Sequence, residues 1–252
     1  MLNESLAGLG LTITFLTYYG LNLYVYRGYP RWVLRRGLSS LHGVYLSFDD
    51  GPSPKYTQRV LDILEENKVE AAFFLIGKQA SKCPSLVREI RSRGHLVGNH
   101  TQNHLLLPLL SSRRIYKEIV DGKMTLEDIL GESVDMLRPP RGLFDRRVLK
   151  ISRKLDLKLV LWSLSSFDWR GMKANAILRH VRKKIRPGDV LLFHDGGYVF
   201  GRFGSNRENS VNSLPLILDL LPTRGLKPLP FSLLLEREEK GRRWQKSLFS
   251  LP

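Results

Sequence analysis

Two adjacent carboxylates, Asp49 and Asp50, end an apolar run at residues 44–48 and are followed at once by the turn pair Gly51-Pro52. Two negative side chains in succession repel each other, so folding alone gives no reason to place them there. Adjacent residues on a strand point to opposite sides. One carboxylate can therefore hold a cation while the other takes part in proton transfer beside it. For an isolated Asp-Asp-Gly, an acidic turn that solvates a strand end would be the simpler interpretation.

Two histidines, His100 and His104, lie four residues apart. On a helical turn this spacing would place both imidazoles on one face, as ligands of one metal ion require. With one aspartate oxygen they form a set of three ligands that leaves positions open for water and substrate, which is the arrangement of catalytic zinc sites. His42, His95 and His180 have no such partners, and we interpret them as structural or surface residues.

The elements that must position these side chains alternate along the chain from residue 43 onward. Short apolar runs are separated by amphipathic segments, and this order indicates βα units. The predicted strands are 44–48, 71–76, 95–98, 134–137, 158–162, 190–193 and 228–233. The predicted helices are 57–67, 85–93, 112–130, 146–155, 175–185 and 213–221. Seven strands with intervening helices predict an α/β fold, a barrel of the (β/α) kind that is either complete or incomplete.

Five of the predicted strands are each followed directly by an unusual polar cluster. In (β/α) barrels the site is built at the carboxyl ends of the strands. A chance scatter of polar residues would not select the same end of five strands. The sequence therefore predicts one site that collects residues from 49–50, 99–104, 138–142, 165–169 and 194–195.

Read in order, these clusters resemble the motifs of the polysaccharide deacetylases, which are carbohydrate esterase family 4 with the NodB-homology domain. The matching motifs are Ser-Phe-Asp-Asp-Gly-Pro at 47–52, Asn-His-Thr-x-x-His at 99–104, Arg-Pro-Pro-x-Gly at 138–142, Asp-Trp at 168–169 and Leu-x-His at 192–194. The resemblance covers about residues 43–235. It implies a deformed (β/α) barrel of about seven strands that binds a divalent metal and removes N-acetyl groups from sugars.

The resemblance also implies roles in proton transfer for four side chains. Asp49 matches the catalytic base, and Arg138 matches the arginine that orients it. His194 matches the general acid that protonates the leaving amine, and Asp168 matches the carboxylate that tunes this histidine. Amide hydrolysis agrees with this division, because it needs an activated water and a proton for a poor leaving group.

The implied metal is zinc, with cobalt or another divalent cation as an alternative. Its implied ligands are Asp50, His100 and His104. Three further positions match residues that contact the substrate. The backbone N–H of Arg141 is expected to bind the tetrahedral oxyanion, and Trp169 and Leu192 are expected to shape the acetate pocket.

The sequence departs from the family pattern at positions that leave the catalytic groups intact. Ser165 stands where the family often has aspartate, and Arg141 stands where it has tyrosine. The loop 196–210 is longer than in many relatives, and its aromatic residues could form a lid that stacks on sugars. We expect an active enzyme.

The leading hypothesis is a metal-dependent hydrolase that removes N-acetyl groups from N-acetylhexosamine residues of a polysaccharide, with peptidoglycan as the expected substrate. Chitooligosaccharides are the alternative substrate, and a non-catalytic glycan-binding relative is the alternative protein class. The net charge of +16 favours anionic surroundings. We find no basic helix register or RNA-binding pattern, so we expect no nucleic-acid partner. We expect a monomer.

The chain of 252 residues suits one large domain with small appendages. We divide it into an N-terminal membrane-anchor candidate with a basic linker at 1–42, a catalytic domain at 43–235 and a charged C-terminal tail at 236–252. The stretch 6–26 carries no charge and is long enough to span a bilayer. A buried helix or hairpin packed on the domain is the alternative.

Arginines at 27, 31, 35 and 36 follow this stretch, and positive charge on that side favours a cytoplasmic domain. An enzyme that acts on cell-wall sugars must face outward. We therefore expect a single-pass protein of the cell membrane with its catalytic domain outside.

Overall fold

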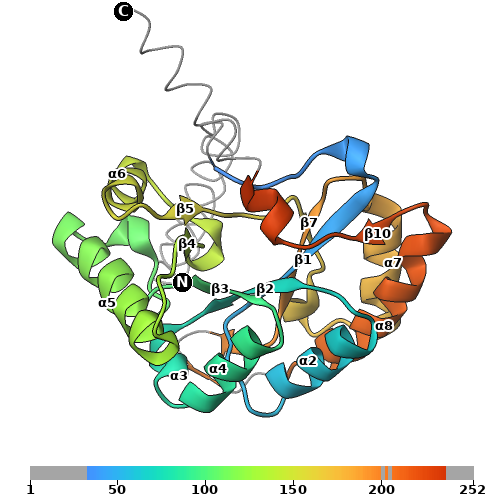
Figure 1. Ribbon diagram of the computed structural model, residues 1–252, viewed down its shortest axis with the longest axis horizontal. Helices are drawn as coiled ribbons and strands as arrows, with labels where there is room; N and C mark the ends of the chain where they lie inside the picture. Colours follow the sequence, from blue (N-terminus) through green and yellow to red (C-terminus); the bar gives the residue numbers. More distant parts are fainter. Residues whose placement is uncertain (1–32, 200–201, 204–205, 237–252) are drawn as a thin grey trace, which may run out of the picture.

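The protein is described by a computed structural model that covers residues 33–199, 202–203 and 206–236. A curved parallel sheet forms its centre (Figure 1). The strands lie in the order β5-β4-β3-β2-β1-β7-β6, and β10 pairs with the start of β1. Their bounds are β1 Gly43–Asp49, β2 Ala71–Leu75, β3 Leu96–Asn99, β4 Met136–Leu137, β5 Lys158–Leu159, β6 Leu164–Ser165, β7 Val190–His194 and β10 Lys227–Pro228. This is the predicted deformed barrel, left open on one side.

Helices cover the convex side of the sheet (Figure 1). Their bounds are α2 Thr57–Glu66, α3 Gly77–Ala80, α4 Pro84–Ser92, α5 Ser112–Leu130, α6 Arg146–Lys154, α7 Ala174–Lys184 and α8 Glu208–Thr223. Helix α5 has the predicted bounds. Ser111 caps its first turn through a bond from the Arg114 N–H, and Gly131 ends it in the left-handed conformation.

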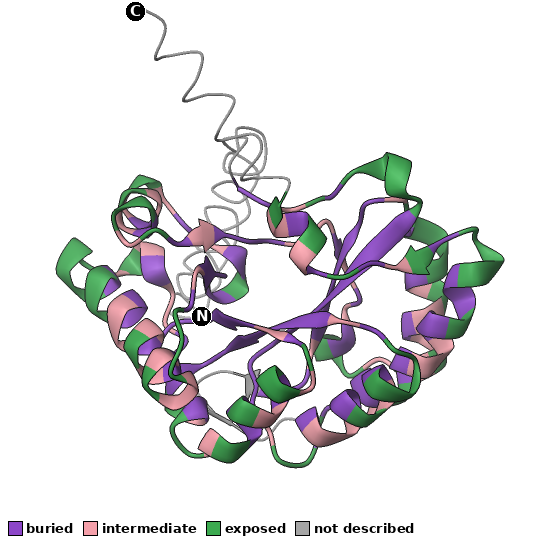
Figure 2. Ribbon diagram, viewed as in Figure 1, coloured by how far each residue is buried: buried purple, intermediate pink, exposed green. Residues whose placement is uncertain are grey.

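Alternation along the strands separates two apolar layers. Val44, Leu46 and Phe48 of β1 pack outward with the helices, in a cluster that includes residues of α2, α4, α7 and α8. The alternate residue Tyr45 packs in a second cluster with Phe74, on the concave side of the sheet. Figure 2 shows the resulting buried strands between half-exposed helices. The concave side thus receives every second side chain, and at the strand ends these are polar.

Two segments outside the βα units fill the concave side. Leu34 forms a parallel bridge with Val160, and Gly37 donates its N–H to the carbonyl of Gly188 at 2.7 Å. The described start of the chain therefore runs from one edge of the sheet to the loop before β7. Phe231 packs edge-on against Tyr45 and closes the bottom of the concave side.

The structure corrects three predicted elements. The apolar run 228–233 is not one strand, because only Lys227–Pro228 pairs with β1 and residues 232–236 are helical. The predicted strand 158–162 pairs only over Lys158–Leu159, and a separate strand, β6, follows it. Helix α8 begins five residues earlier than predicted, at Glu208. The predicted loop 196–210 ends at Arg207, and it contains a short antiparallel pair, β8 Tyr198–Val199 and β9 Arg202–Phe203.

The predicted anchor, 6–26, lies outside the described residues. Among the residues that are described, no helix is both long and apolar enough to cross a membrane. Val33, at the start of the described chain, packs in the cluster beneath α5 and α6.

Candidate active site

The strand register brings the polar clusters together at one edge of the sheet. In the parallel pairing of β1 and β7, Asp49 lies directly opposite His194. Asn99 at the end of β3 lies opposite Leu137 of β4, which places Arg138 beside the histidine loop. Because all these strands are parallel, their carboxyl ends meet at the same edge, as the sequence predicted.

Asp50, His100 and His104 form a buried cluster whose ligand atoms all lie within 4.8 Å of one another. Asp50 Oδ1 is 3.5 Å from His100 Nε2 and 3.2 Å from His104 Nε2. Two imidazole nitrogens and one carboxylate oxygen are a donor set that divalent metals accept, with further positions left for water and substrate.

Hydrogen bonding prepares these groups to bind a cation. His100 Nδ1 lies 2.7 Å from the carbonyl oxygen of Arg138. A carbonyl accepts only, so Nδ1 carries a proton, and Nε2, which faces Asp50, is the nitrogen available to bind a metal. Burial raises the pKa of Asp50, but the nearby His100 and His104 rings and the charge of His194 outweigh it and hold that pKa well below its ordinary value. Burial lowers the pKa of His104 and favours the neutral ring. The residues present therefore fit a divalent metal.

The backbone that presents these ligands is not helical. Asp50, Thr101 and His104 all have positive φ, at 74°, 66° and 57°. L-residues adopt this region rarely, and such conformations cluster at functional sites. Two expectations are therefore corrected: the histidines converge through a loop and not a helical turn, and Asp49 and Asp50 do not face apart. The turn at Asp50 brings both carboxylates toward His100, at 3.8 Å for Asp49 Oδ2 and 3.5 Å for Asp50 Oδ1.

Buried polar groups that the sequence analysis missed hold the histidine loop. Glu118 of α5 accepts hydrogen bonds from the backbone N–H and the side chain of Asn103, at 2.9 and 2.8 Å. Asn99 accepts from the Thr101 N–H at 2.8 Å and donates to the carbonyl of Ile119. Glu118 lies three residues after Ile115 on the apolar stripe of α5, and an acid on a buried stripe was the signal that could have revealed it.

A buried ion pair holds Asp49. Arg138 is fully buried and donates to Asp49 Oδ1 at 2.6 Å and to the Ser47 hydroxyl at 2.9 Å. Its guanidinium also donates to the carbonyls of Val160 and Leu161 and lies 3.9 Å from the centre of the Phe74 ring. Burial lowers the pKa of Arg138, and the charge of Asp49 opposes that shift. One oxygen of Asp49 is thus occupied, while Oδ2 faces His100.

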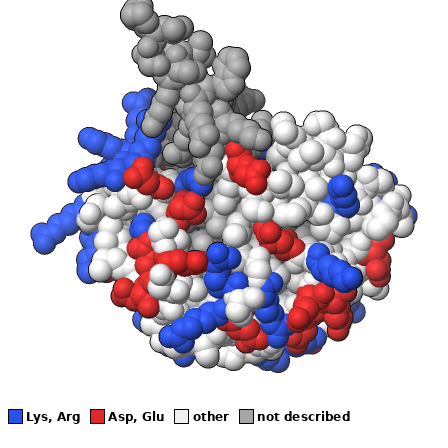
Figure 3. Space-filling view, in the orientation of Figure 1, with Lys and Arg blue, Asp and Glu red and all other residues white. Residues whose placement is uncertain are grey.

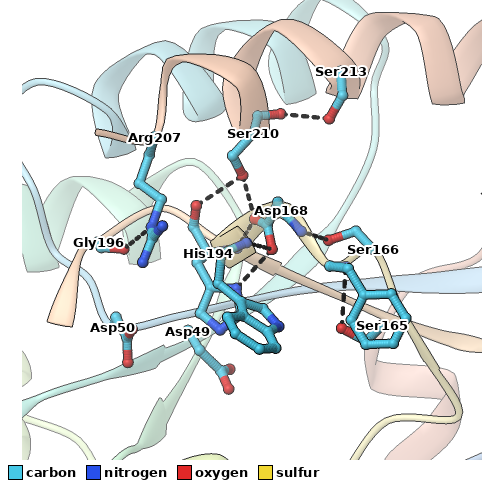
Figure 4. A network of polar contacts seen from close by, with 12 residues as sticks. Asp49, Asp50, Ser165, Ser166, Asp168, His194, Gly196, Arg207, Ser210 and Ser213 are labelled. Atoms are coloured by element: carbon cyan, nitrogen blue, oxygen red, sulfur yellow. Dashed lines mark hydrogen bonds and ion pairs between the residues drawn. The ribbon is translucent and has the colours of Figure 1, made fainter. Parts of the chain in front are cut away.

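His194, which is partly buried, and the buried Asp168 form a second pair (Figure 4). His194 Nδ1 lies 2.8 Å from Asp168 Oδ1, and the His194 N–H donates to Asp168 Oδ2 at 2.7 Å. Burial lowers the pKa of His194, but the charge of Asp168, its hydrogen bond and the charges of Asp50 and Asp49 raise it to about 9. Burial raises the pKa of Asp168, and the bonds and charge of His194 lower it below its ordinary value. The pair is therefore an imidazolium held by a carboxylate.

The three predicted substrate contacts differ in how far they are buried. Leu192 alternates with His194 on β7 and points to the same concave side, where it is buried. Trp169 follows Asp168 and keeps 46% of its surface exposed, with the Arg170 guanidinium 5.0 Å from its ring. Arg141 is exposed and has a φ of 58° within the short turn Pro140–Gly142.

A glycine lets the loop after β7 lie directly on the Asp50 backbone. A Cβ added at Gly196 would come within 2.0 Å of the Asp50 carbonyl oxygen. The Arg207 side chain donates to the Gly196 carbonyl at 2.7 Å and fixes this approach (Figure 4). Close backbone approach is a role that only glycine fills here.

Comparisons with known proteins agree with this geometry. A family model described as polysaccharide deacetylase matches residues 40–160. A peptidoglycan-N-acetylglucosamine deacetylase of Bacillus cereus is 37% identical over 194 residues, which are 76% of this chain and 87% of that protein. A chitooligosaccharide deacetylase of Sinorhizobium fredii is 35% identical over 208 residues, covering 80% of this chain and 96% of that protein. The crystal structure of a peptidoglycan N-acetylglucosamine deacetylase is similar with a TM-score of 0.73 and 30% identity, over 79% of this chain and 90% of that one.

Proposed function

The chain belongs to the polysaccharide deacetylase family, and from this premise we propose that it hydrolyses the N-acetyl groups of N-acetylglucosamine residues in peptidoglycan, with zinc as its metal. The observation that carries the proposal is the meeting of a buried metal-ligand triad with two separate proton-transfer pairs at one edge of the sheet. The reaction is metal-dependent hydrolysis of an amide that is not a peptide bond.

Asp50, His100 and His104 would hold the metal. Two nitrogens and one oxygen suit zinc, and cobalt accepts the same set. The bound cation would lower the pKa of a water molecule and polarise the acetyl carbonyl. Asp49 would then accept a proton from the attacking water through Oδ2, while Arg138 keeps Oδ1 in place.

His194 would supply the proton that the departing amine needs. With a pKa raised to about 9, its ring is protonated at neutral pH. Asp168 occupies Nδ1, so the transferable proton sits on Nε2. Asp49 and His194 lie opposite each other on neighbouring strands. The base and the acid therefore come from separate hydrogen-bonded pairs, as hydrolysis of an amide requires.

Replacing His194 with alanine is expected to lower kcat on an N-acetylated glycan by about a thousandfold. Hydrolysis of 4-nitrophenyl acetate should fall far less, because nitrophenolate leaves without being protonated. Acetate release and nitrophenolate absorbance measure the two rates on one preparation. Equal losses on both substrates would mean that His194 positions the substrate and is not the acid.

Replacing Asp168 with asparagine is expected to move the alkaline limb of the pH–rate profile to lower pH. Asp168 stabilises the protonated ring, so removing its charge lowers the pKa of His194, and the acid is lost earlier as pH rises. A bound dication adds a further downward shift that is common to both proteins. The profile of kcat against pH, measured for both with the same metal loaded, gives the shift. Coincident limbs would exclude this role for Asp168.

The substrate is tested by measuring acetate release from purified peptidoglycan and from chitooligosaccharides side by side. We expect the higher kcat/KM on peptidoglycan. The reverse order would identify the chain as a chitooligosaccharide deacetylase, and no release from either, with metal bound, would favour a non-catalytic glycan-binding protein.

We also propose that the catalytic domain lies outside the cell membrane, held by the stretch 6–26. The net charge of +16 suits an anionic wall and lipid surface. Figure 3 shows Lys and Arg gathered on one side of the molecule, where Figure 1 places α6. The exposed cations of α6 are Arg146, Lys150, Arg153 and Lys154. Protease treatment of intact, wall-stripped cells tests the orientation, and a domain digested only after lysis would reverse it.

A further inference from the structure

A serine on α8 contacts the His194–Asp168 pair from a separate element. Ser210 lies in the first turn of α8 and is only 4% exposed. Its hydroxyl lies 2.5 Å from Asp168 Oδ2 and 2.9 Å from the carbonyl oxygen of His194 (Figure 4). One hydroxyl proton serves both acceptors, and the shorter contact is to the charged one.

Ser210 completes the hydrogen bonding of Asp168. Asp168 Oδ1 accepts from His194 Nδ1 at 2.8 Å and from the Trp169 N–H at 2.9 Å. Oδ2 accepts from the His194 N–H at 2.7 Å and from Ser210. Three of these four bonds, counted over the described residues, come from Trp169 and His194 themselves. Ser210 therefore links the Asp168 carboxylate to α8, whereas Asp168 and His194 belong to other elements.

The hydrogen bonds of the Ser210 hydroxyl to Asp168 and His194 differ from the bond that a serine within a helix usually makes. Serines within helices commonly bond back to a carbonyl of the preceding turn, as Ser152 does with Val148 in α6 at 2.8 Å. Ser213, one turn further along α8, behaves in the same way and donates to the carbonyl of Ser210 at 2.8 Å. Ser210 instead points out of its helix toward Asp168 and His194 (Figure 4).

We infer that Ser210 is a positioning residue for amide cleavage, which fixes the rotation of the Asp168 carboxylate so that Oδ1 stays on His194 Nδ1. This inference rests on the proposed role of His194 as general acid. When the ring passes from charged to neutral, its attraction for Asp168 weakens, and a second anchor keeps the carboxylate in place. In agreement, the hydrogen bond from Ser210 is among the causes that lower the pKa of Asp168, after burial and His194.

The test compares Ser210→Ala, Ser210→Thr and, as a matched control, Ser213→Ala. Each protein, as the full metal-loaded chain, is assayed for kcat and KM on a chitooligosaccharide or peptidoglycan fragment and for hydrolysis of 4-nitrophenyl acetate. We expect Ser210→Ala to lower kcat on the amide by about tenfold, with KM unchanged and the ester rate within about twofold. Ser210→Thr, which keeps the hydroxyl, should restore the amide rate. Ser213→Ala removes an equally buried hydroxyl of the same helix and should leave the ratio of amide to ester rates unchanged.

Loss of amide and ester activity together in Ser210→Ala, or the same ratio change in Ser213→Ala, would show a structural role and overturn the inference. If Ser210→Ala does not fold, Ser210→Cys keeps the side-chain size with a poor donor and should show the same selective loss. His194→Ala in the same assays separates the two hypotheses. A selective loss there with unchanged Ser210→Ala overturns the Ser210 inference alone, whereas an unselective loss in His194→Ala overturns the acid assignment beneath it.

Discussion

The substitution Asp49→Asn is expected to lower kcat for acetate release by about a thousandfold while the protein keeps its metal. The amide has the shape of the carboxylate and can still accept the hydrogen bond that Arg138 donates at 2.6 Å. It cannot accept a proton from water at neutral pH. Asp49 is 3.8 Å from the nearest ligand nitrogen, and Asp50 lies closer to both histidines. The measurement is kcat together with metal content by atomic absorption.

The same substitution also has a predictable cost in stability. Arg138 is fully buried, and removing the Asp49 charge leaves it with no opposing charge in contact among the described residues. Removing one charge of a buried ion pair lowers the free energy of unfolding by about 3 kcal/mol. Circular dichroism at the assay temperature shows whether Asp49→Asn is folded. A variant that is folded and metal-loaded but inactive has lost its base and not its structure.

The matched control is Asp50→Asn, which makes the same chemical change one residue later. We expect this variant to lose metal and activity together, because Asp50 Oδ1 faces both imidazoles. Equal loss of metal from Asp49→Asn would mean that the two aspartates have exchanged roles.

Much of the fold follows from local patterns in the sequence. The strand at β1 alternates, so that Val44, Leu46 and Phe48 pack on helices while Tyr45 and Asp49 face the concave side. Because successive side chains of a strand point to opposite faces, the position of the strand determines which side chains share a face. Helix α5 carries its own start and stop signals and was predicted to the residue. The polar clusters could be assigned to one edge because parallel strands end together.

Other features depend on tertiary contacts that no local pattern encodes. The run 228–233 is apolar, and an apolar run alone does not distinguish a strand from a buried helical segment. Here Pro230 follows the short pairing of β10, and Phe231 enters the concave side against Tyr45. The first three residues of helix α8, 208–210, are polar, so an apolar pattern does not mark the turn that carries Ser210.

The site shows the same division between residue types and backbone geometry. The sequence motifs predicted that Asp50, His100 and His104 lie together and that His194 pairs with Asp168, and the structure places them so. They did not reveal that His104 reaches the site through a left-handed backbone with a φ of 57°. Nor did they reveal Glu118, which accepts hydrogen bonds from Asn103, a residue fifteen positions earlier in the sequence. Residues such as Glu118 become hydrogen-bond partners of the loop only in the folded protein, and no sequence motif marks them.

The double substitution His100→Ala with His104→Ala is expected to abolish both metal binding and acetate release. Each ring contributes one Nε2 atom within 3.5 Å of Asp50 Oδ1, and one carboxylate alone is a poor site for zinc. Binding to the folded state alone also raises stability, by about 2.7 kcal/mol at a hundredfold excess over Kd. For a domain of this size that corresponds to an increase in Tm of about 5 to 10 °C. The wild-type protein should show this increase when zinc is added after chelation, and the double variant should show none.

The exposed His42 provides the control for removal of an imidazole as such. His42→Ala should keep the metal content, the zinc-dependent rise in Tm and the activity of the wild type. Retention of one metal per chain by the double variant would contradict the assignment. It would place the metal on other groups, and the orientation of His100 Nε2 toward Asp50, which the Arg138 carbonyl fixes through Nδ1, would have no role in metal binding. The orientation of His100, the buried carboxylate and the paired rings have a common explanation only if the cation binds between them.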